Sequence, residues 1–331
     1  MSEPQAHGSH AVDLGAASGS GASSAHGTAD QGGTGYGAGG GPAVPADVDP
    51  ERDDARRSSP SLGIRLTYGF GTDRGLRREL NEDSFIAVEP VFAVADGMGG
   101  HEAGEVASSI CVRTLGASSI IGSRAPQFTA NDLEDLIRDA DQRIRSEAGG
   151  HAGTTLTGAV LVEESGAPYW LFFNVGDSRT YRLSGGTFGQ ISVDHSEVQE
   201  LVDIGRITEE EARTHPRRHV VTRALGTGDD AEADFWLMPV EEGDRILLCS
   251  DGLSGEVTDD GICTILSTVE DPQEACDELI AATLRSGARD NVTVIVIDAS
   301  DLGGHDADAI TVPRGGLFAA DGDARLPGAP A

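Results

Sequence analysis

Alternating apolar and polar side chains divide residues 62–300 into a series of strands and helices. Period-two alternation and short apolar runs between turn residues indicate strands. Such segments occupy residues 64–70, 85–88, 91–95, 154–162, 169–175, 178–183, 187–192, 233–238, 245–250 and 292–298. Residues 195–225 lose this alternation and contain Pro216, so we expect an excursion with short helices there.

Four other segments carry apolar residues at helical spacing, which predicts amphipathic helices. They cover residues 102–115, 131–144, 258–268 and 272–285. Asn131, followed by Glu134 three residues later, predicts the start of the second helix as a capping box. Asp271 before Pro272 predicts the start of the last helix, and Gly287 predicts its end.

The order of these elements favours an α+β fold with mostly antiparallel sheets. Strands follow one another in long runs, and the helices come in pairs. This order is typical of antiparallel sheets with helices outside them, rather than of a doubly wound parallel sheet. The last strand is apolar almost throughout, so we expect it in the middle of a sheet.

Two terminal segments differ in composition from the rest of the chain. Residues 1–61 are rich in Gly, Ala, Ser and acids, and residues 301–331 are rich in Gly, Pro and Asp. Such segments bury too little apolar surface to offset the entropy of ordering them, so we predict that both are disordered. The folded domain then covers residues 62–300, with the excursion at 195–225 as a flap.

The charge of the 331-residue chain is strongly unbalanced. Its 55 acidic and 24 basic residues give a formal net charge of −31, and every base is arginine. Such a polyanion is expected to avoid nucleic acid and anionic membranes. The absence of lysine also excludes P-loop nucleotide hydrolases, protein kinases and Schiff-base enzymes, because each of these classes needs a lysine amine.

The four cysteines favour a reducing compartment. Cys111, Cys249, Cys263 and Cys276 have neither zinc-ligand nor redox spacing, and none has the arginine that a cysteine phosphatase loop requires. Three of them lie in apolar stretches, where buried thiols are expected. The sequence shows no signal peptide pattern and no apolar run near the roughly 20 residues of a membrane span. We therefore predict a cytoplasmic protein.

Acidic residues recur where a predicted strand meets a glycine or a polar turn. The four sites are Glu82-Asp83, Asp96-Gly97, Asp251-Gly252 and Asp290-Asn291. Taken singly, such pairs also suit ordinary turns or solvated loops. Taken together, they suit Mg²⁺ or Mn²⁺, which prefer oxygen ligands, and unpaired carboxylates would be costly to bury side by side. The set therefore predicts one cleft that holds two hard cations.

Seven short motifs follow one another in order along the predicted domain. They are Arg78-Glu79-Leu80-Asn81-Glu82-Asp83-Ser84, Ala95-Asp96-Gly97-Met98-Gly99-Gly100-His101, Gly153-Thr154-Thr155, Val175-Gly176-Asp177-Ser178-Arg179, Arg223-Ala224-Leu225-Gly226, Ser250-Asp251-Gly252-Leu253 and Asp290-Asn291-Val292-Thr293. Over residues 64–299 this set resembles the metal-dependent protein serine/threonine phosphatases (PPM or PP2C type), most closely the bacterial branch. The resemblance implies a four-layer α-β-β-α sandwich, in which two mostly antiparallel sheets are flanked by helix pairs and hold a metal centre.

The resemblance also implies a role for each acidic site. One metal would be held by Asp83, Asp96, Asp251 and Asp290, and a second by Glu82, Asp96 and the Gly97 carbonyl. Arg78 would bind the substrate phosphate, because a guanidinium fork suits that bidentate contact. Asp177 matches the residue that, with Asp251, contributes to a third metal in bacterial relatives; alternatively, it is a turn acid that pairs with Arg179.

The motif around Asp96 departs from many relatives at one position. Met98 stands where those relatives have a histidine that serves as general acid to the leaving oxygen. The resemblance to the bacterial variant keeps activity possible but leaves the proton donor unassigned. His101 is near in sequence, although a surface histidine at a helix start is an alternative, and a metal-bound water could serve instead.

The function that the resemblance implies is hydrolysis of phosphoserine and phosphothreonine on proteins. A water bridging Mn²⁺ or Mg²⁺ ions would attack phosphorus, in a centre of two metals or of three. The expected partners are phosphorylated proteins and the serine/threonine kinases that this dephosphorylation counteracts in signal transduction, and we expect a monomer. The alternative is a non-catalytic regulatory module of the same fold that binds phosphoproteins. A calcium-binding surface would need an Asp-x-Asp-x-Asp-Gly loop, which is absent.

Overall fold

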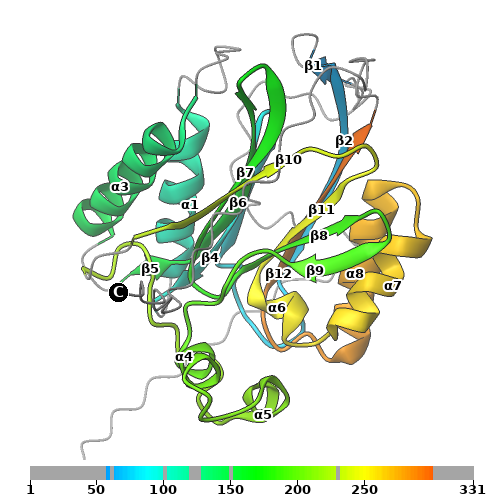
Figure 1. Ribbon diagram of the computed structural model, residues 1–331. Coiled ribbons are helices and arrows are strands. Elements are labelled where there is room, and N and C mark those ends of the chain that lie inside the picture. The colour runs from blue at the N-terminus through cyan, green and yellow to red at the C-terminus, as the bar shows by residue number, and fades with distance from the viewer. Residues whose placement is uncertain are drawn as a thin grey trace, which may run out of the picture. The chain divides into compact units, whose positions relative to one another are not determined.

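A computed structural model describes residues 57–59, 63–99, 103–118, 128–148, 152–228 and 232–300. The prediction that residues 1–61 are disordered is wrong for residues 57–59, which form a strand because they pair with residues 64–66. The rest of the predicted disorder, at both termini, and the placement of His101 lie outside the described residues. The described residues form two six-stranded sheets that pack face to face (Figure 1). Every pairing between the named strands in the described residues is antiparallel, which confirms the predicted sheet type.

The first sheet has the strand order β1-β2-β12-β11-β8-β9. Its strands are β1 (Arg57–Ser59), β2 (Ile64–Asp73), β12 (Val292–Ser300), β11 (Arg245–Cys249), β8 (Arg179–Ser184) and β9 (Thr187–Gln190). β12 lies between β2 and β11, as its nearly continuous apolar run predicted. A strand buried on both faces has no solvent-facing positions to fill with polar residues.

The second sheet has the order β10-β7-β6-β4-β3, with the short β5 paired to the end of β4. Its strands are β10 (Asp234–Pro239), β7 (Ala167–Val175), β6 (Leu156–Glu164), β4 (Val91–Met98), β3 (Asp83–Val88) and β5 (Gly153–Thr154). Phe92, Trp170 and Phe172 of this sheet are buried against Ile246 and Ile295 of the other. This apolar layer holds the two sheets together.

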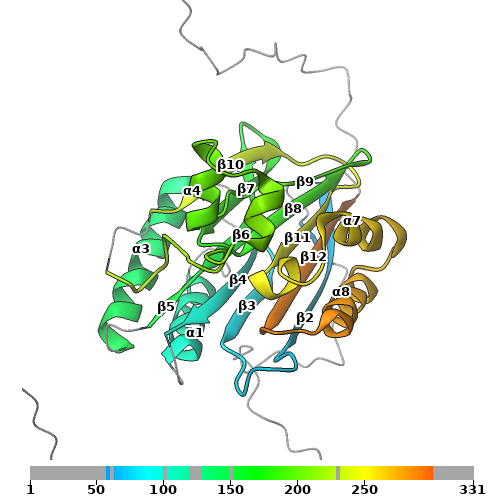
Figure 2. The same ribbon diagram turned by 90° about the horizontal axis from the view of Figure 1, so that it is seen from below.

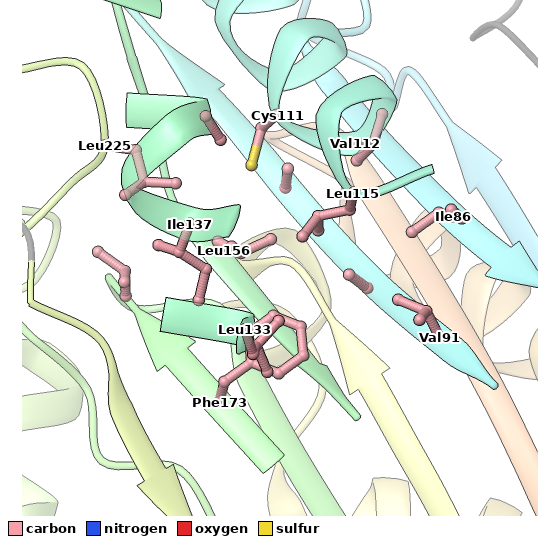
Figure 3. Packing of buried hydrophobic residues seen from close by; sticks show 14 of the residues in the cluster. Ile86, Val91, Cys111, Val112, Leu115, Leu133, Ile137, Leu156, Phe173 and Leu225 are labelled. Carbon is pink, nitrogen blue, oxygen red and sulfur yellow. The ribbon is translucent and has the colours of Figure 1, made fainter. Parts of the chain in front are cut away.

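A helix pair covers the outer face of each sheet (Figures 1 and 2). Helices α1 (Ala103–Gly116) and α3 (Ala130–Glu147) pack on the second sheet, and α7 (Asp259–Thr268) and α8 (Pro272–Ser286) pack on the first. Figure 3 shows Leu115, Leu133 and Ile137 from the first pair meeting Phe173 of β7. Fully burying each such side chain contributes about 1.5–3 kcal/mol. The result is the predicted four-layer sandwich.

Two helix starts differ from the sequence prediction. Helix α3 is capped by Thr129 with Asp132, two residues earlier than the predicted pair Asn131 and Glu134. Phe128 and Leu133 pack in the same core cluster, as a hydrophobic staple around that cap. The predicted strand at 245–250 stops at residue 249, because Ser250 begins the unpredicted short helix α6 (Asp251–Ser254).

Residues 195–225 contain the predicted short helices, α4 (Glu197–Asp203) and α5 (Glu209–Thr214). Both ends of this flap are tied to the sheets by backbone bonds. His195 N donates to Gly176 O at 2.9 Å, and Leu225 N donates to Thr154 O at 2.9 Å. The flap therefore begins and ends beside the segments that carry Asp177 and Asp96.

Candidate metal centre

Strand register brings the first two predicted acids together. Asp83 of β3 lies directly opposite Asp96 of β4, and side chains at opposed positions of an antiparallel pair share one face. The main chain of Asp96 is held by two threonines. Thr155 Oγ1 accepts from Asp96 N at 3.1 Å, and Thr154 Oγ1 donates to Asp96 O at 3.0 Å. The end of β4 is thus fixed where its carboxylate projects.

Asp251 and Asp290 reach the same place from the other sheet. Asp251 is the first residue of α6, directly after β11, and Asp290 precedes β12. Ser250 joins the two sheets at this point, because its hydroxyl donates to Asp83 Oδ2 at 2.8 Å and accepts from Thr293 N at 3.0 Å. A Cβ on Gly252 would lie 1.9 Å from the Asn291 carbonyl oxygen, so only glycine allows this approach.

The loop that carries Arg78 and Glu82 is anchored by Asn291. Its side-chain oxygen accepts from Glu82 N at 2.9 Å, and its amide donates to the carbonyls of Arg74 and Leu80 at 2.9 Å each. Arg78 then donates to Asp290 Oδ2 at 2.7 Å and lies 3.7 Å from Glu82 Oε2. One guanidinium therefore spans two of the predicted ligands at the rim of the acidic cluster.

Asp177 lies in the turn after β7, and its surroundings bear on whether it pairs with Arg179 or faces the other acids. Arg179 pairs with Asp194 through three hydrogen bonds of 2.7–3.0 Å, rather than with Asp177. Burial raises the pKa of Asp177 well above its usual range, and the nearby Asp251 carboxylate raises it further. The turn therefore directs Asp177 towards the other acids, and its role as a ligand stays a prediction.

The pKa shifts show how closely the acids are grouped. Burial raises the pKa of Asp83 to about 7, and the carboxylates of Asp251 and Asp290 add to this effect. Burial, and then the charges of Asp83 and Asp251, raise the pKa of Asp96 well above its usual range. Burial and Asp290 likewise raise the pKa of Asp251, although 26% of its side chain remains exposed. The shifts therefore show that several like charges are held close together in one buried cluster.

Several carboxylate oxygens in this cluster have no partner. Glu82 Oε1, Asp83 Oδ1 and Asp251 Oδ1 are buried without a hydrogen bond. An ionised carboxylate can only accept, so such oxygens fit a hard divalent cation such as Mg²⁺ or Mn²⁺. Within the described ranges, no group of three or more His, Cys, Asp or Glu side chains is arranged closely enough to hold a metal ion as it stands.

The structure thus gathers all the predicted site residues around one end of the two sheets. Gly97 belongs to the group through backbone contacts: its N donates to Glu82 O at 3.2 Å, and it pairs with Thr154. Sequence reasoning missed Ser250 and Asn291, which stand inside two of the quoted motifs. It also missed His195 and His219, which lie in the flap; His219 Nδ1 is 4.0 Å from Asp251 Oδ2.

His195 is buried at the base of the flap and makes contacts on both ring nitrogens. Its Nδ1 accepts from Gly176 N at 3.1 Å, so the neutral ring carries its proton on Nε2, which lies 3.1 Å from Asp234 Oδ2. Together with the backbone bond from His195 N to Gly176 O, these contacts hold the turn that carries Asp177. A histidine in a region without regular patterning gave no sequence signal for this role.

Comparison with known proteins finds one family for this part of the chain. Residues 71–291 match the protein phosphatase 2C family. A serine/threonine phosphatase stp from Listeria welshimeri is 36% identical over 243 residues, which cover 69% of this chain and 94% of that protein. The serine/threonine protein phosphatase PstP of Mycobacterium tuberculosis is 42% identical over 243 residues, 71% of this chain but only 45% of that protein.

Solved structures agree with these sequence matches. The crystal structure of the PstP catalytic domain in complex with two manganese ions superposes with a TM-score of 0.65 and 38% identity, covering 72% of this chain and 100% of that one. The serine/threonine phosphatase Stp1 of Staphylococcus aureus gives a TM-score of 0.64 and 33% identity, over 72% and 96% of the two chains. None of the helices described for this chain is long and apolar enough to cross a membrane.

Proposed function

Because the chain belongs to the protein phosphatase 2C family, we propose that it hydrolyses phosphoserine and phosphothreonine on proteins with the help of Mn²⁺ or Mg²⁺. The observation that carries this proposal is the set of buried, unpartnered carboxylate oxygens on Glu82, Asp83 and Asp251 beside the arginine fork of Arg78. Carboxylates arranged in this way suit cations, and the arginine suits the phosphate that would approach them.

The residues that would hold the cations come from both sheets. Asp83, Asp96, Asp251 and Asp290 are proposed for one ion, and Glu82, Asp96 and the Gly97 carbonyl for another. Asp177, beside Asp251, is proposed for a third. When bound, such ions position a water, lower its pKa and offset negative charge on the phosphoryl oxygens. The protein supplies the fixed carboxylate frame, since Ser250 and Asn291 tie its members to both sheets.

Arg78 is proposed to bind and orient the phosphoryl group. Its side chain is 47% exposed, so it can meet a substrate at the mouth of the acidic cluster. Its planar fork donates two parallel hydrogen bonds to a phosphate more readily than a lysine amine could. Its hydrogen bond to Asp290 and its ion pair with Glu82 keep the guanidinium pointed towards the cluster before substrate arrives.

The proton for the leaving oxygen must come from a group other than residue 98. Met98 ends β4 and has no ionisable hydrogen, so it cannot act as a general acid. The structure leaves this donor unassigned, because His101 lies outside the described residues. The exposed His219 of the flap is the histidine that the structure places beside Asp251.

We infer that the physiological partners are phosphoproteins and the serine/threonine kinases that modify them, because a phosphatase of this class is useful only where such kinases act. Cys111, Cys249, Cys263 and Cys276 are all free thiols, and three of them are buried. Free thiols persist in reducing compartments, which supports a cytoplasmic location. Whether the chain is a monomer stays a prediction.

The test of the proposed function is hydrolysis of a phosphothreonine peptide under three conditions. Phosphate release is measured for the wild type with Mn²⁺, for the wild type with a chelator, and for Asp251→Asn with Mn²⁺. We expect turnover only in the first condition, with losses of at least about 10²-fold in the others, as for removal of an electrostatic catalytic group. Equal rates in all three would contradict the mechanism. Peptide binding without turnover would instead support a regulatory module of this fold.

A further inference from the structure

Two exposed arginines beside Arg78, the proposed phosphate-binding residue, have no acidic partner among the residues that the structure describes. Most arginines that the structure describes, such as Arg138, Arg179 and Arg289, form ion pairs. Arg74 and Arg77 form none within the described ranges, although acids outnumber bases 55 to 24 in this chain. Arg113, Arg206 and Arg218 also form no ion pair within the described ranges, so what sets Arg74 and Arg77 apart is their place on the loop that carries Arg78.

The backbone that carries these arginines is held in one conformation. Leu76 N donates to Ala288 O at 2.9 Å, and the Asn291 amide donates to the carbonyls of Arg74 and Leu80 at 2.9 Å each. Gly75 adopts φ +74°, and a Cβ there would lie 2.2 Å from Asp290 O. Figure 2 shows this connection between β2 and β3 beside the start of β12. The loop is therefore fixed against the residues that precede β12.

Two leucines of the same loop face solvent. Leu76 is 63% exposed and Leu80 is 43% exposed, so neither contributes fully to the core. The exposed side chains Arg74, Leu76, Arg77 and Leu80, which we name the arginine–leucine rim, combine positive charge with apolar surface. A partner that covers these side chains would gain binding free energy from burying the leucines and from forming ion pairs with the arginines.

We propose that the arginine–leucine rim binds the residues that flank the phosphorylated side chain of a protein substrate, and that it selects substrates with acidic flanks. This inference rests on the proposed function. A phosphate bound by Arg78 would place the neighbouring substrate residues, which are about 3.3–3.6 Å apart in an extended chain, over the same loop. Elsewhere a chain with net charge −31 repels acidic substrates, so a local positive rim decides which of them can approach.

The experiment compares two phosphothreonine peptides of equal length in the full chain with Mn²⁺. One peptide carries glutamates on both sides of the phosphothreonine, and the other carries glutamines at the same positions. The measured quantity is the ratio of kcat/KM for the acidic and the neutral peptide. It is determined for the wild type, for the double variant Arg74→Gln with Arg77→Gln, and for Arg113→Gln as a matched control. Arg113 lies in α1, is exposed and forms no ion pair within the described ranges.

We expect the wild type to prefer the acidic peptide and the double variant to lose about 3- to 10-fold of that preference. Two exposed ion pairs of about 0.2–1 kcal/mol each would together change the ratio by about 2- to 30-fold, and the expected loss lies within this range. The control should keep the wild-type ratio, and added salt should lower the ratio in the wild type more than in the double variant. Circular dichroism verifies that all variants are folded.

The inference is overturned if the ratio is unchanged in the double variant, or if Arg113→Gln lowers it equally. It is also overturned if the double variant gains activity on both peptides, since the rim would then hold an acidic segment of the chain itself. Failure of the proposed function looks different. In that case the wild type with Mn²⁺ hydrolyses neither peptide, and no phosphate is released from p-nitrophenyl phosphate.

Discussion

Replacing Asp83 by asparagine should stabilise the metal-free protein at neutral pH. Asp83 is buried among other acids, and its pKa is raised to about 7. Its Oδ1 has no partner, while its Oδ2 accepts from Ser250. An asparagine fills nearly the same volume and can still accept that bond through its amide oxygen. The substitution therefore removes a buried negative charge and little else.

The expected magnitude follows from the pKa. An unfolded aspartate has a pKa near 3.9, so the folded value is raised by about three units, each worth about 1.4 kcal/mol. This gives an upper value of about 4 kcal/mol for ionising Asp83 in the folded state. Because nearby Asp251 and Asp290 share the same protons, we expect about 2–4 kcal/mol.

The sign of the pH dependence follows from the same shift. A group whose pKa is raised on folding binds protons more tightly in the folded state. Its stabilising contribution is complete below the unfolded pKa near 4 and is lost as the pH rises through about 7. Metal-free wild type should therefore lose stability between pH 4 and pH 8, and Asp83→Asn should lose less. The two proteins should differ most at pH 8 and least at pH 4.

The assay is urea unfolding of metal-depleted protein at pH 4, 6 and 8. The matched control is Asp203→Asn, the same change at an exposed residue that ends α4. With saturating Mn²⁺ the wild type should become the more stable of the two proteins. Only the wild type would retain the full ligand set, and metal binding to the folded state raises its free energy of unfolding. If metal-free Asp83→Asn is less stable than the wild type at pH 8, or if their difference does not shrink at low pH, the account of a charge-strained cluster is wrong.

Two further substitutions test how the centre is supported. In His195→Asn the side-chain amide can still accept from Gly176 N, whereas in His195→Gln it cannot. Calorimetric titration should therefore show that the glutamine variant binds Mn²⁺ more weakly than the asparagine variant, by about 3-fold or more. Equal Mn²⁺ affinities of the two variants would contradict the positioning role of His195. Gly252→Ala should destabilise the fold by at least about 1–3 kcal/mol in thermal unfolding, because its Cβ would lie 1.9 Å from Asn291 O. Gly189→Ala, where a Cβ meets nothing within 4 Å, should be nearly neutral.

Most of the fold followed from patterning. Except for β1 and the short β5, the strands were predicted from apolar spacing, and the two helix pairs, the antiparallel sheets and the central position of β12 followed from apolar spacing and element order. The start of α3 was not predicted, because Thr129 with Asp132 and Asn131 with Glu134 are both acceptable capping pairs. Packing of Phe128 and Leu133 in one cluster decides between them, and such packing has no local sequence signature.

The residues that support the centre were harder to predict than the acids themselves. Acids at strand ends beside glycine stand out, because each contradicts the apolar pattern around it. Ser250 and Asn291 do not stand out, since a serine or asparagine at a turn is ordinary. Their importance appears only when Ser250 reaches Asp83, 167 residues away, and Asn291 reaches Glu82, 209 residues away.

The sequence by itself determined the fold class and the acids that this fold brings together, while the roles of these acids in the chemistry stay predictions. It did so because hydrophobic periodicity and the placement of acids are local properties of the chain. Only the tertiary structure decided that Arg179 pairs with Asp194, that the flap is tied to Gly176 through His195, and that Arg74 and Arg77 have no acidic partner in the described residues. These facts depend on contacts between segments far apart in sequence, which only the packed sheets bring together.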